Sequence, residues 1–326
     1  MTISVIATVK NERETIATWF ESVLMQGMAH VEYVIVDGGS TDGTWEWLQE
    51  KARDCKELQV VQVVGGRSQG RNEAIKRTVG DIIVAADAGC RYEHGWLAAL
   101  TAPFFHDRAE VVAGAFGPWF MAHDTLIHYL VASSTTPAPE EFQKNWLPSS
   151  RSVAFTRERF QESGGYPEWL EIGEDVVFDL ALVNIGARFA YSRTPLVFWR
   201  PQAKVWLYMK QLYRYTRGDG QANLWPRRQL IRYVAYGGGL FAASFVVRGI
   251  HMWLLLVLGA GVAVYMHKFW KRFSVFTKPL TLEKQMAGYA LLPFVVALGD
   301  MAKMIGYIAG AWQRLTGKIH IPPRAS

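Results

Sequence analysis

The chain is 326 residues long, half of its residues are hydrophobic and only 20% are charged, a composition that is apolar for a soluble enzyme. Residues 227–326 contain thirteen Lys and Arg and two acids, a net charge of +11, so residues 1–226 carry −5. This distribution argues against nucleic acid as the partner, because nucleic-acid enzymes carry their positive field at the active site, and it favours an anionic lipid surface. The two cysteines, Cys55 and Cys90, have neither disulfide-framework nor zinc-ligand spacing, which indicates a reducing compartment.

Short apolar runs alternate with helical patterns over the first 105 residues. The first run lacks the features of a signal peptide and is interrupted by Asn11 and Glu12, so it predicts a strand and a cytosolic N-terminal part. The alternation is typical of βα units and predicts an α/β, Rossmann-like fold, with a mostly parallel sheet and helices on both faces. The expected strands are 3–8, 33–36, 58–64 and 81–86, and the expected helices are 12–25, 44–53, 69–78 and 95–105.

Polar residues follow the ends of the expected strands: Thr8, Asp37, Gly66 and Asp87 each stand where an apolar run stops. In open α/β sheets the ligand lies off the carboxyl ends of the strands. We therefore expect these four residues to converge in space. Further along, the acids Glu174 and Asp175 open an expected helix that ends near residue 185, where the helix dipole favours negative charge.

The C-terminal part of the chain, from about residue 231, is much more apolar than the part before it. Two apolar stretches, residues 231–247 and 249–266, are divided by Arg248, and a third runs from 288 to 312. The first two are each near the lower limit for crossing a bilayer core of about 30 Å. Asp300 and Lys303 share one helical face, so they would pair or face a partner helix. A loop between the second and third stretches is expected to lie on the cytosolic side, because it would carry five cations, at positions 268, 271, 272, 278 and 284.

Four motifs in the same order resemble the family 2 glycosyltransferases, which have the GT-A fold. They are TVKNE at 8–12, VDGGSTDGT at 36–44, GED at 173–175 and QLYRY at 211–215, and the resemblance runs from Ile3 to about Gly220. It implies nucleotide contacts for Thr8, Lys10, Asn11, Glu12, Asp37, Gly66, Arg71 and Asp87. The same resemblance implies a catalytic-base motif at Glu174 and Asp175, with Asp175 as the base, and inversion at the sugar carbon. Gln211, Arg214 and Tyr215 are similar to the family's Q-x-x-R-W signature, with Tyr in the last position.

The sequence departs from this family at the metal site. The usual D-x-D is here Asp87-Ala88-Gly89, so the second carboxylate is absent. We hypothesise that Arg91, with Arg214 or Arg217, supplies part of the charge of a divalent ion, since guanidinium groups clamp phosphate oxygens in a bidentate way. In the alternative, Asp87 holds Mg²⁺ or Mn²⁺ together with waters and phosphates.

The expectation is therefore a GT-A catalytic domain at 1–226, with a nucleotide-binding half at 1–110 and an acceptor half at 111–226, followed by a membrane domain at 227–326 with two to three transmembrane helices. The expected activity is transfer from a UDP- or GDP-sugar to a lipid or lipid-linked acceptor, in a multi-pass protein of the cytoplasmic membrane with its catalytic domain in the cytosol. Membrane lipids are expected partners, and nucleic acid is not. Three alternatives are a polyprenyl-phosphate glycosyl synthase, a non-catalytic nucleotide-binding scaffold and a transport component.

Overall fold

The computed structural model describes residues 2–142, 146–249 and 253–319. Two compact units are present, and each is built from segments that are not adjacent in the sequence. The first unit comprises Met1–Trp119 and Pro139–Arg200, and the second comprises Phe120–Ala138 and Pro201–Ser326. The domain limits expected at 110 and 226 stay predictions.

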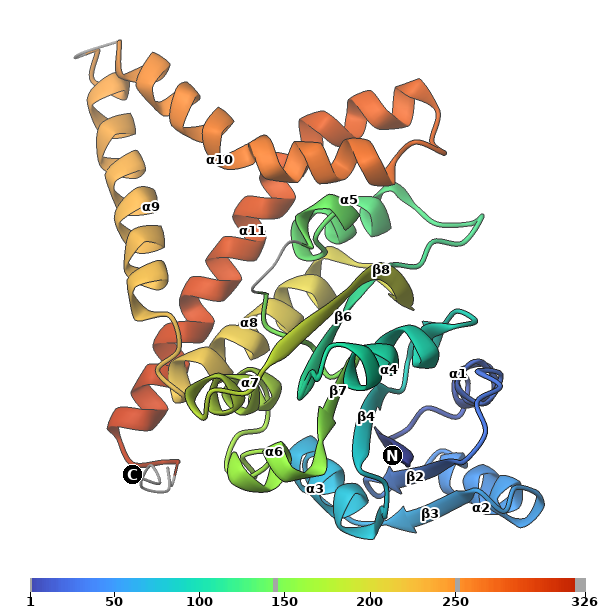
Figure 1. The fold of residues 1–326 in the computed structure, drawn as a ribbon. Helices are drawn as coiled ribbons and strands as arrows, with labels where there is room; N and C mark the ends of the chain where they lie inside the picture. The colour runs from blue at the N-terminus through green and yellow to red at the C-terminus, as the bar shows by residue number, and fades with distance from the viewer. Residues whose placement is uncertain (1, 143–145, 250–252, 320–326) are drawn as a thin grey trace. The chain divides into compact units, whose positions relative to one another are not determined.

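The first unit contains an eight-stranded sheet in the order β3-β2-β1-β4-β7-β6-β8-β5 (Figure 1). The first four strands in this order are parallel, β6 and β8 are parallel, and the other neighbours are antiparallel. The sheet is thus parallel in its N-terminal half, as expected, and mixed beyond it. The strands are β1 Ile3–Val9, β2 Val31–Asp37, β3 Leu58–Gln62, β4 Ile82–Asp87, β5 Cys90–Tyr92, β6 Val111–Pro118, β7 Val153–Thr156 and β8 Phe189–Trp199.

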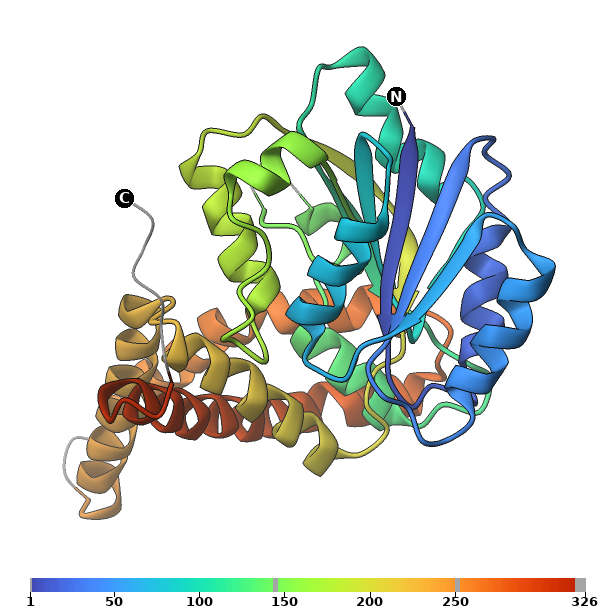
Figure 2. The same ribbon diagram turned by 90° about the horizontal axis from the view of Figure 1, so that it is seen from below.

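Helices cover both faces of this sheet because alternate strand residues point to opposite sides. In β2, Tyr33 and Ile35 join one core cluster with α1, α2 and α4, whereas Val34 and Val36 join a second cluster with α3 and α7. Figure 2 shows α1 and α2 on one side of these strands and α3 on the other. The helices are α1 Ile16–Leu24, α2 Thr44–Asp54, α3 Arg67–Arg77, α4 Trp96–His106, α6 Arg157–Glu162 and α7 Glu174–Asn184, with a 3-10 turn η1 at Pro139–Glu141.

Burial of one face of α7 fixes the helix that carries Glu174 and Asp175. Phe178 is 1% exposed and packs against Phe155 and Tyr166. We expect Phe178→Ala to lower the free energy of unfolding by about 3–5 kcal/mol, because it leaves a cavity in the core. Val183→Ala on the exposed side of the same helix is the control, and a change there of about 0.5 kcal/mol or less is expected. Urea unfolding measures both, and equal losses would contradict this account of the core.

The second unit consists of helices: α5 Leu126–Thr135, α8 Val205–Gln221, α9 Pro226–Val247, α10 Leu254–Phe276 and α11 Leu282–Leu315. Glycines bring α8 and α11 into backbone contact. A Cβ at Gly310 would lie 1.9 Å from the carbonyl oxygen of Arg217, and one at Gly306 would lie 2.4 Å from that of Tyr213. Close approach through small residues is a common way for apolar helices to pack.

Among the described residues, α10 and α11 are long and apolar enough to cross a membrane, judged by length and composition. The expected first stretch, 231–247, lies in α9. The expected basic loop is mostly helical: Lys268, Lys271 and Arg272 belong to α10 and Lys284 to α11, so only Lys278 stands in the connection. The aromatic residues Phe269, Phe273 and Phe276 are buried, and their packing extends α10 past the end of its apolar run.

Candidate active site

The carboxyl ends of β1, β2 and β4 bring the first sequence motifs to one edge of the sheet. Strand register pairs Thr8 with Asp87 on one side of β1, and Val9 with Asp37 on the other. Gly66 precedes the first residue of α3, which follows β3. This register brings Thr8, Asp37 and Asp87 together as predicted, whereas Gly66 stands four residues beyond the end of β3 and its convergence with them stays a prediction.

Two loops at this edge are joined by hydrogen bonds. The Asn11 backbone N–H donates to Ser40 Oγ at 2.8 Å, and the Thr41 backbone N–H donates to Asn11 Oδ1 at 2.9 Å. The Glu12 N–H donates to Thr44 Oγ1 at 2.9 Å. Asn11 has a φ of 55°, a left-handed conformation that Asn adopts more readily than most residues. The TVKNE and VDGGSTDGT segments are therefore held together by these hydrogen bonds. Because residues 10–13 belong to this pair of loops, α1 begins only at Ile16, later than expected.

Asp37 is fully buried and its carboxylate organises the second loop. Its Oδ2 accepts from the backbone N–H groups of Gly39 and Ser40 at 3.0 and 2.9 Å and from Gln62 Nε2 at 2.9 Å. Its Oδ1 accepts from the Ser40 hydroxyl. The side chain of Lys10, in contrast, is exposed. Asp37 thus shapes the loop, and its contact with a nucleoside stays a prediction.

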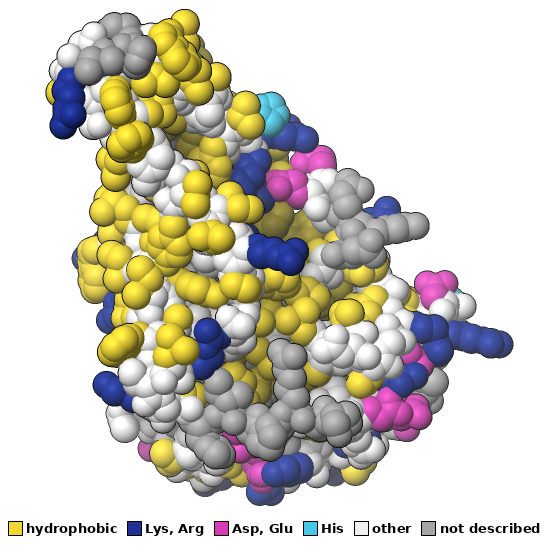
Figure 3. Space-filling model, turned by 90° about the vertical axis from the view of Figure 1, so that its left-hand side faces the viewer, with side chains coloured by type: hydrophobic (Ala, Val, Ile, Leu, Met, Phe, Trp, Pro, Cys, Tyr) yellow, Lys and Arg dark blue, Asp and Glu magenta, His cyan; other side chains and the backbone are white. Residues whose placement is uncertain are grey.

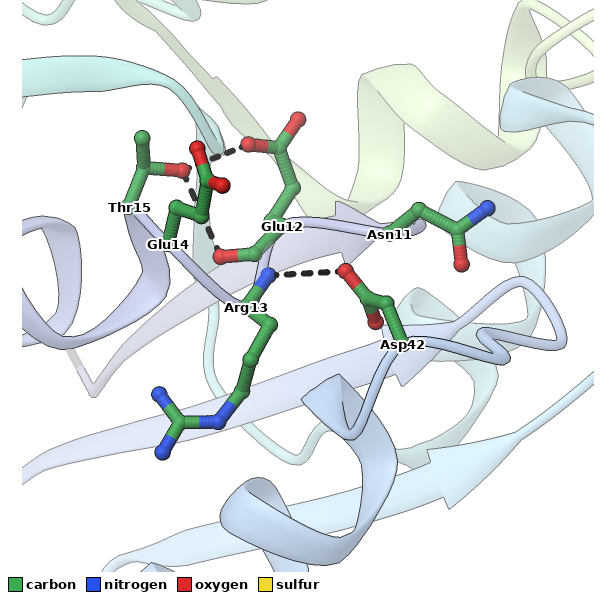
Figure 4. Close-up of a pocket in the computed structure, with 6 residues that line it drawn as sticks. All are labelled: Asn11, Glu12, Arg13, Glu14, Thr15 and Asp42. Carbon is green, nitrogen blue, oxygen red and sulfur yellow. Dashed lines mark hydrogen bonds between the residues drawn. The ribbon is translucent and has the colours of Figure 1, made fainter.

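A pocket of about 450 Å³ lies beside these loops (Figure 4). In it, Arg13 donates its backbone N–H to Asp42 at 3.0 Å, and Thr15 donates its hydroxyl to Glu12 at 2.6 Å. The lining residues are Asn11, Glu12, Arg13, Glu14, Thr15 and Asp42. Two predicted nucleotide contacts, Asn11 and Glu12, are among them, whereas the residues at the end of β4 and the start of α7 are not.

Arg71 joins three segments that are far apart in the sequence. Its guanidinium, 4% exposed, lies 2.6 Å from Glu174 Oε1 through Nη1 and 2.8 Å from Asp87 Oδ1 through Nη2. The guanidinium also lies over the ring of Tyr166, 5.2 Å from its centroid. The sequence placed Arg71 against the nucleotide, and the structure adds that it holds the end of β4 beside the start of α7.

Asn72, the next residue, fixes the loop that leads into α7. Its side chain donates to the Tyr166 carbonyl oxygen at 2.9 Å and to Glu168 Oε1 at 2.9 Å. The Tyr166 N–H donates back to Asn72 Oδ1 at 3.0 Å. Gly173, with a φ of 88°, then turns the chain into the helix, a conformation that favours glycine.

The two acids of the GED motif have different environments. Glu174 is 4% exposed and its carboxylate is engaged by Arg71, whereas Asp175 is partly exposed in the first turn of α7. Burial and the neighbouring Asp175 raise the pKa of Glu174 above its ordinary value, against the opposing effect of Arg71. Asp175 Oδ1 accepts the N–H of Val176 at 2.9 Å. Asp175 is thus the acid of this pair that a substrate can reach.

Arginines surround Asp87. Burial raises the pKa of its carboxyl, but Arg71, Arg151 and Arg67 together outweigh burial and hold that pKa below its ordinary value. Arg151 lies over the rings of Phe116 and Trp199, at 5.5 and 5.3 Å. Neither Arg67 nor Arg151 was predicted: Arg67 lies next to the predicted Gly66, but only folding brings these two arginines to β4.

The residues predicted to bind the diphosphate or the acceptor lie on two elements. Arg91, on β5, has its Nε 3.6 Å from Glu93 and lies over the Trp119 ring at 5.7 Å. The remaining four belong to α8, in the second compact unit, where Gln211 donates to the Tyr215 hydroxyl at 2.8 Å. They are Gln211, Arg214, Tyr215 and Arg217.

The fit of a divalent metal is limited by the number of acids. Within the described ranges no group of three or more His, Cys, Asp and Glu could hold a metal ion. Asp87 is the carboxylate at the tip of β4, and one of its oxygens is paired with Arg71. A cation there would take most of its ligands from diphosphate oxygens and waters.

Asp179, one turn after Asp175, is a further buried acid that the sequence analysis missed. It is 2% exposed, and its Oδ2 has no hydrogen-bond partner among the residues that the structure describes. Burial, and then the charge of Asp175, raise its pKa well above the ordinary value. A raised folded-state pKa contributes stability below the unfolded pKa of about 4, and this stability is lost as the pH rises towards the folded value.

We therefore expect Asp179→Asn to gain stability relative to the wild type as the pH rises. The amide does not ionise, so the melting-temperature difference between variant and wild type should be more positive at pH 8 than at pH 5. Differential scanning calorimetry at both pH values measures it. Asp54→Asn, at an exposed position on α2, is the control. A pH-independent difference for Asp179→Asn would show that this carboxyl titrates normally.

Residues 4–160 match the sequence profile of Glycosyl transferase family 2. The pre-mycofactocin glycosyltransferase of Mycobacterium tuberculosis is 24% identical over 208 residues, covering 60% of this chain and 41% of the relative. TuaG of Bacillus subtilis, named as a putative glycosyltransferase of teichuronic acid biosynthesis, is 33% identical over 93 residues, covering 28% of this chain and 37% of the relative. The chain therefore spans about two-fifths of the length of these relatives.

Two solved structures share the fold. The mannosyltransferase PcManGT from Pyrobaculum calidifontis, solved with GDP-Man and Mn²⁺, superposes with a TM-score of 0.56 at 20% identity, covering 97% of this chain and 87% of that one. TarS 1–349 of S. aureus gives a TM-score of 0.50 at 15% identity, covering 97% and 92%. At such identities the likeness concerns the fold, which is of the GT-A type. Residues 4–160 therefore belong to a family 2 glycosyltransferase domain.

Proposed function

We propose that this protein is an inverting glycosyltransferase that moves a sugar from a UDP- or GDP-sugar to a lipid or lipid-linked acceptor at the cytosolic face of a membrane. The observation that carries the proposal is the Arg71 bridge, because it sets Asp87 beside the GED acids. A donor diphosphate near Asp87 would then lie within reach of the partly exposed Asp175. The structural neighbour PcManGT was solved in complex with GDP-Man, which is consistent with a nucleotide-sugar donor.

Asp175 is the proposed general base. It takes the proton of the acceptor hydroxyl while the acceptor oxygen bonds to the anomeric carbon, and the bond from that carbon to the diphosphate oxygen breaks. The nucleoside diphosphate leaves with the electron pair. Glu174 cannot share this role, because Arg71 engages it, so it is proposed to position α7. A single displacement with one accessible carboxylate gives inversion at the sugar carbon.

Positive charge near Asp87 is proposed to stabilise the departing diphosphate. Arg67 and Arg151 act on Asp87 electrostatically, and Arg91 follows on β5. Guanidinium groups can bind phosphate oxygens in a bidentate way, and preorganised charge of this kind is a large contributor to catalysis. When bound, Mg²⁺ or Mn²⁺ would neutralise diphosphate charge at Asp87.

Metal removal separates these two sources of charge. A single electrostatic donor in an active site is worth about 10²–10³ in rate, so loss of the main donor would be a large effect. If the arginines supply most of the positive charge on the diphosphate, we expect transfer to fall by less than about 10-fold after thorough chelation. Transfer from a labelled donor is measured with and without EDTA, and after Mn²⁺ is added back. Complete loss on chelation and full recovery with Mn²⁺ would assign the charge to a metal held by Asp87.

A membrane acceptor is supported by the second unit. The α10 helix is largely exposed and apolar, α9 also exposes large apolar side chains, and the tail is strongly basic. By the positive-inside rule, basic segments of this kind favour the cytosolic side, and we propose the same side for the catalytic reaction. In this proposal the chain crosses the membrane more than once.

The test of the proposed function is a transfer assay on the full chain. A panel of UDP- and GDP-sugars is first ranked by thermal shift, and the best donor is then supplied with either a lipid extract or soluble oligosaccharides. Transfer into the organic phase supports the lipid acceptor. Transfer to soluble oligosaccharide with no use of lipid would contradict it, and the absence of any donor-dependent shift would contradict the nucleotide-sugar site.

A further inference from the structure

Five Lys and Arg side chains of α9, α10 and α11 lie near a buried acid, Asp300, or near one another: two pair with Asp300, and the other three interact electrostatically with these two or among themselves. We call them the cationic cluster: Arg228, Arg232, Lys268, Arg272 and Lys303. Asp300 is 0% exposed, and all three helices belong to the second compact unit. Glu283 is the other acid between residues 226 and 315, so this part of the chain has far more positive than negative charge.

Four side chains of the same unit form ion pairs or hydrogen bonds with the carboxylate of Asp300. Lys303 Nζ lies 3.1 Å and Arg232 Nε 3.4 Å from its Oδ1. Tyr236 donates its hydroxyl to Oδ2 at 3.0 Å, and Tyr265 donates to the same oxygen. Asp300 therefore connects α9, α10 and α11, and its one negative charge is shared by groups that already include two cations.

The rest of the cluster consists of like charges. Lys268 interacts electrostatically with Arg272, Arg228 and Lys303, and Lys303 interacts with Arg232 and Arg228. Lys268 and Arg272 both lie over the ring of Phe269, at 4.7 and 5.9 Å. Apart from Arg272, four cations and Asp300 give this group a net charge of +3. Like charges so placed repel one another, and anions that bind to them reduce this repulsion.

Two apolar helix segments, which we call the legs, extend from one end of the cluster: α9 from Arg232 to Val247, and α10 from Leu254 to Lys268. Beyond Arg232, α9 exposes large side chains up to Val247, and α10 does the same before Lys268. Figure 3 shows this face of the molecule, where Lys and Arg side chains stand beside a broad hydrophobic surface. The exposed apolar side chains are Val234, Leu240, Phe241, Val247, Leu255, Leu256, Val257, Val262 and Val264.

The length of the two legs and the position of the cationic cluster at their base are consistent with insertion of the legs into a bilayer. From Arg232 to Val247 the helix rises roughly 22 Å, somewhat less than a hydrocarbon core of about 30 Å. With the legs in the hydrocarbon, the cationic cluster would lie at the level of the head groups. Both arginine and lysine bind phosphate oxygens, arginine in a bidentate way. A soluble anion would satisfy the charge but would leave the apolar legs in water.

We propose that the cationic cluster is a binding site for the phosphate groups of anionic lipids, at the base of the inserted α9 and α10 legs. The inference rests on the membrane attachment proposed above and is independent of the transfer reaction. It assigns to Asp300 the role of holding the three helices so that the cations face one head-group region.

The test is co-sedimentation of the full chain with two kinds of vesicle, phosphatidylcholine alone and phosphatidylcholine partly replaced by phosphatidylglycerol. The variant is Arg228→Gln with Lys268→Gln, which leaves the two ion pairs of Asp300 with Arg232 and Lys303 in place. Each basic residue near an anionic surface contributes roughly fivefold, so for two residues we expect the partition onto phosphatidylglycerol vesicles to fall about 10- to 30-fold. Partition onto phosphatidylcholine alone should not change.

The matched control removes the same charge elsewhere, by Lys278→Gln with Lys318→Gln. An equal loss in the control would show a diffuse attraction and overturn the site. Circular dichroism melting checks the fold, and Lys268→Gln alone carries the test if the double variant melts early. Release by inorganic phosphate at constant ionic strength would assign the cluster to a soluble anion and also overturn the proposal.

The same experiment separates this inference from the proposed function. Binding of the wild type to both vesicles with equal affinity would overturn the lipid-phosphate site and leave membrane attachment standing. Binding to neither would overturn both. Preferential binding to phosphatidylglycerol vesicles, lost in the cluster variant and kept in the control, supports the site.

Discussion

Asp175→Asn is expected to lower the transfer rate by about 10²–10⁴-fold, the usual contribution of a general base, while donor binding persists. The amide keeps the size and the helix position of Asp175 but cannot take the acceptor proton. Since Asp175 is partly exposed and its side chain accepts from the adjacent Val176 N–H, the substitution should leave the fold intact. Transfer of label to acceptor and thermal shift with donor measure the two effects.

The control is Asp54→Asn, which removes an exposed carboxylate at the end of α2. Its transfer rate should equal that of the wild type. An unchanged rate in Asp175→Asn would remove this residue as the base. It would also favour a phosphate acceptor, as in polyprenyl-phosphate sugar transfer, because a phosphate oxygen is already ionised and needs no base. Loss of donor binding in Asp175→Asn would instead place Asp175 in the donor site.

Arg71→Gln is expected to lower both stability and activity strongly. It leaves Glu174, 4% exposed, without its ion partner, and removing one member of a buried pair costs about 3–5 kcal/mol. Transfer should fall as well, because Asp87 and α7 lose the group that joins them. Urea unfolding gives the free energy of unfolding, and the transfer assay is run at a temperature where the variant remains folded.

The double variant Arg71→Gln with Glu174→Gln supplies the control, since it removes the uncompensated charge. It should recover much of the lost stability, and the deviation from additivity measures the coupling. Losses that simply add would contradict a direct role for the ion pair. The single variant should also be relatively more stable at pH 5 than at pH 8. Burial already raises the pKa of Glu174, so protonation at lower pH removes the unpaired charge.

The alternation of apolar runs and helical patterns was sufficient to predict the first four parallel strands and the helices between them. β1, β2 and β4 bury both faces, so their apolar runs are continuous and their ends are marked by polar residues such as Thr8 or Asp87. The rule that parallel strand ends meet at one edge then predicted that Thr8, Asp37, Gly66 and Asp87 lie together. The order of the motifs, compared with family 2 glycosyltransferases, led to the family that the comparisons show.

Contacts between distant segments could not be predicted in this way. Arg71 and Glu174 are 103 residues apart, and no periodicity in the sequence relates them. The same holds for Arg151 beside Asp87 and for the five residues of the cationic cluster, whose positions depend on helix packing. Asp300 and Lys303 are an exception, because a spacing of three on one helix already indicated their pairing.

The sequence by itself therefore determined the local elements and the edge of the sheet at which the polar loops meet, since both depend on short-range patterns of burial. The tertiary structure alone decided which acid of the GED pair is engaged by an arginine and which is accessible. It also decided that residues 120–138 belong with the C-terminal helices. These outcomes depend on the packing of residues far apart in the chain, and hydrophobic periodicity carries no information about such packing.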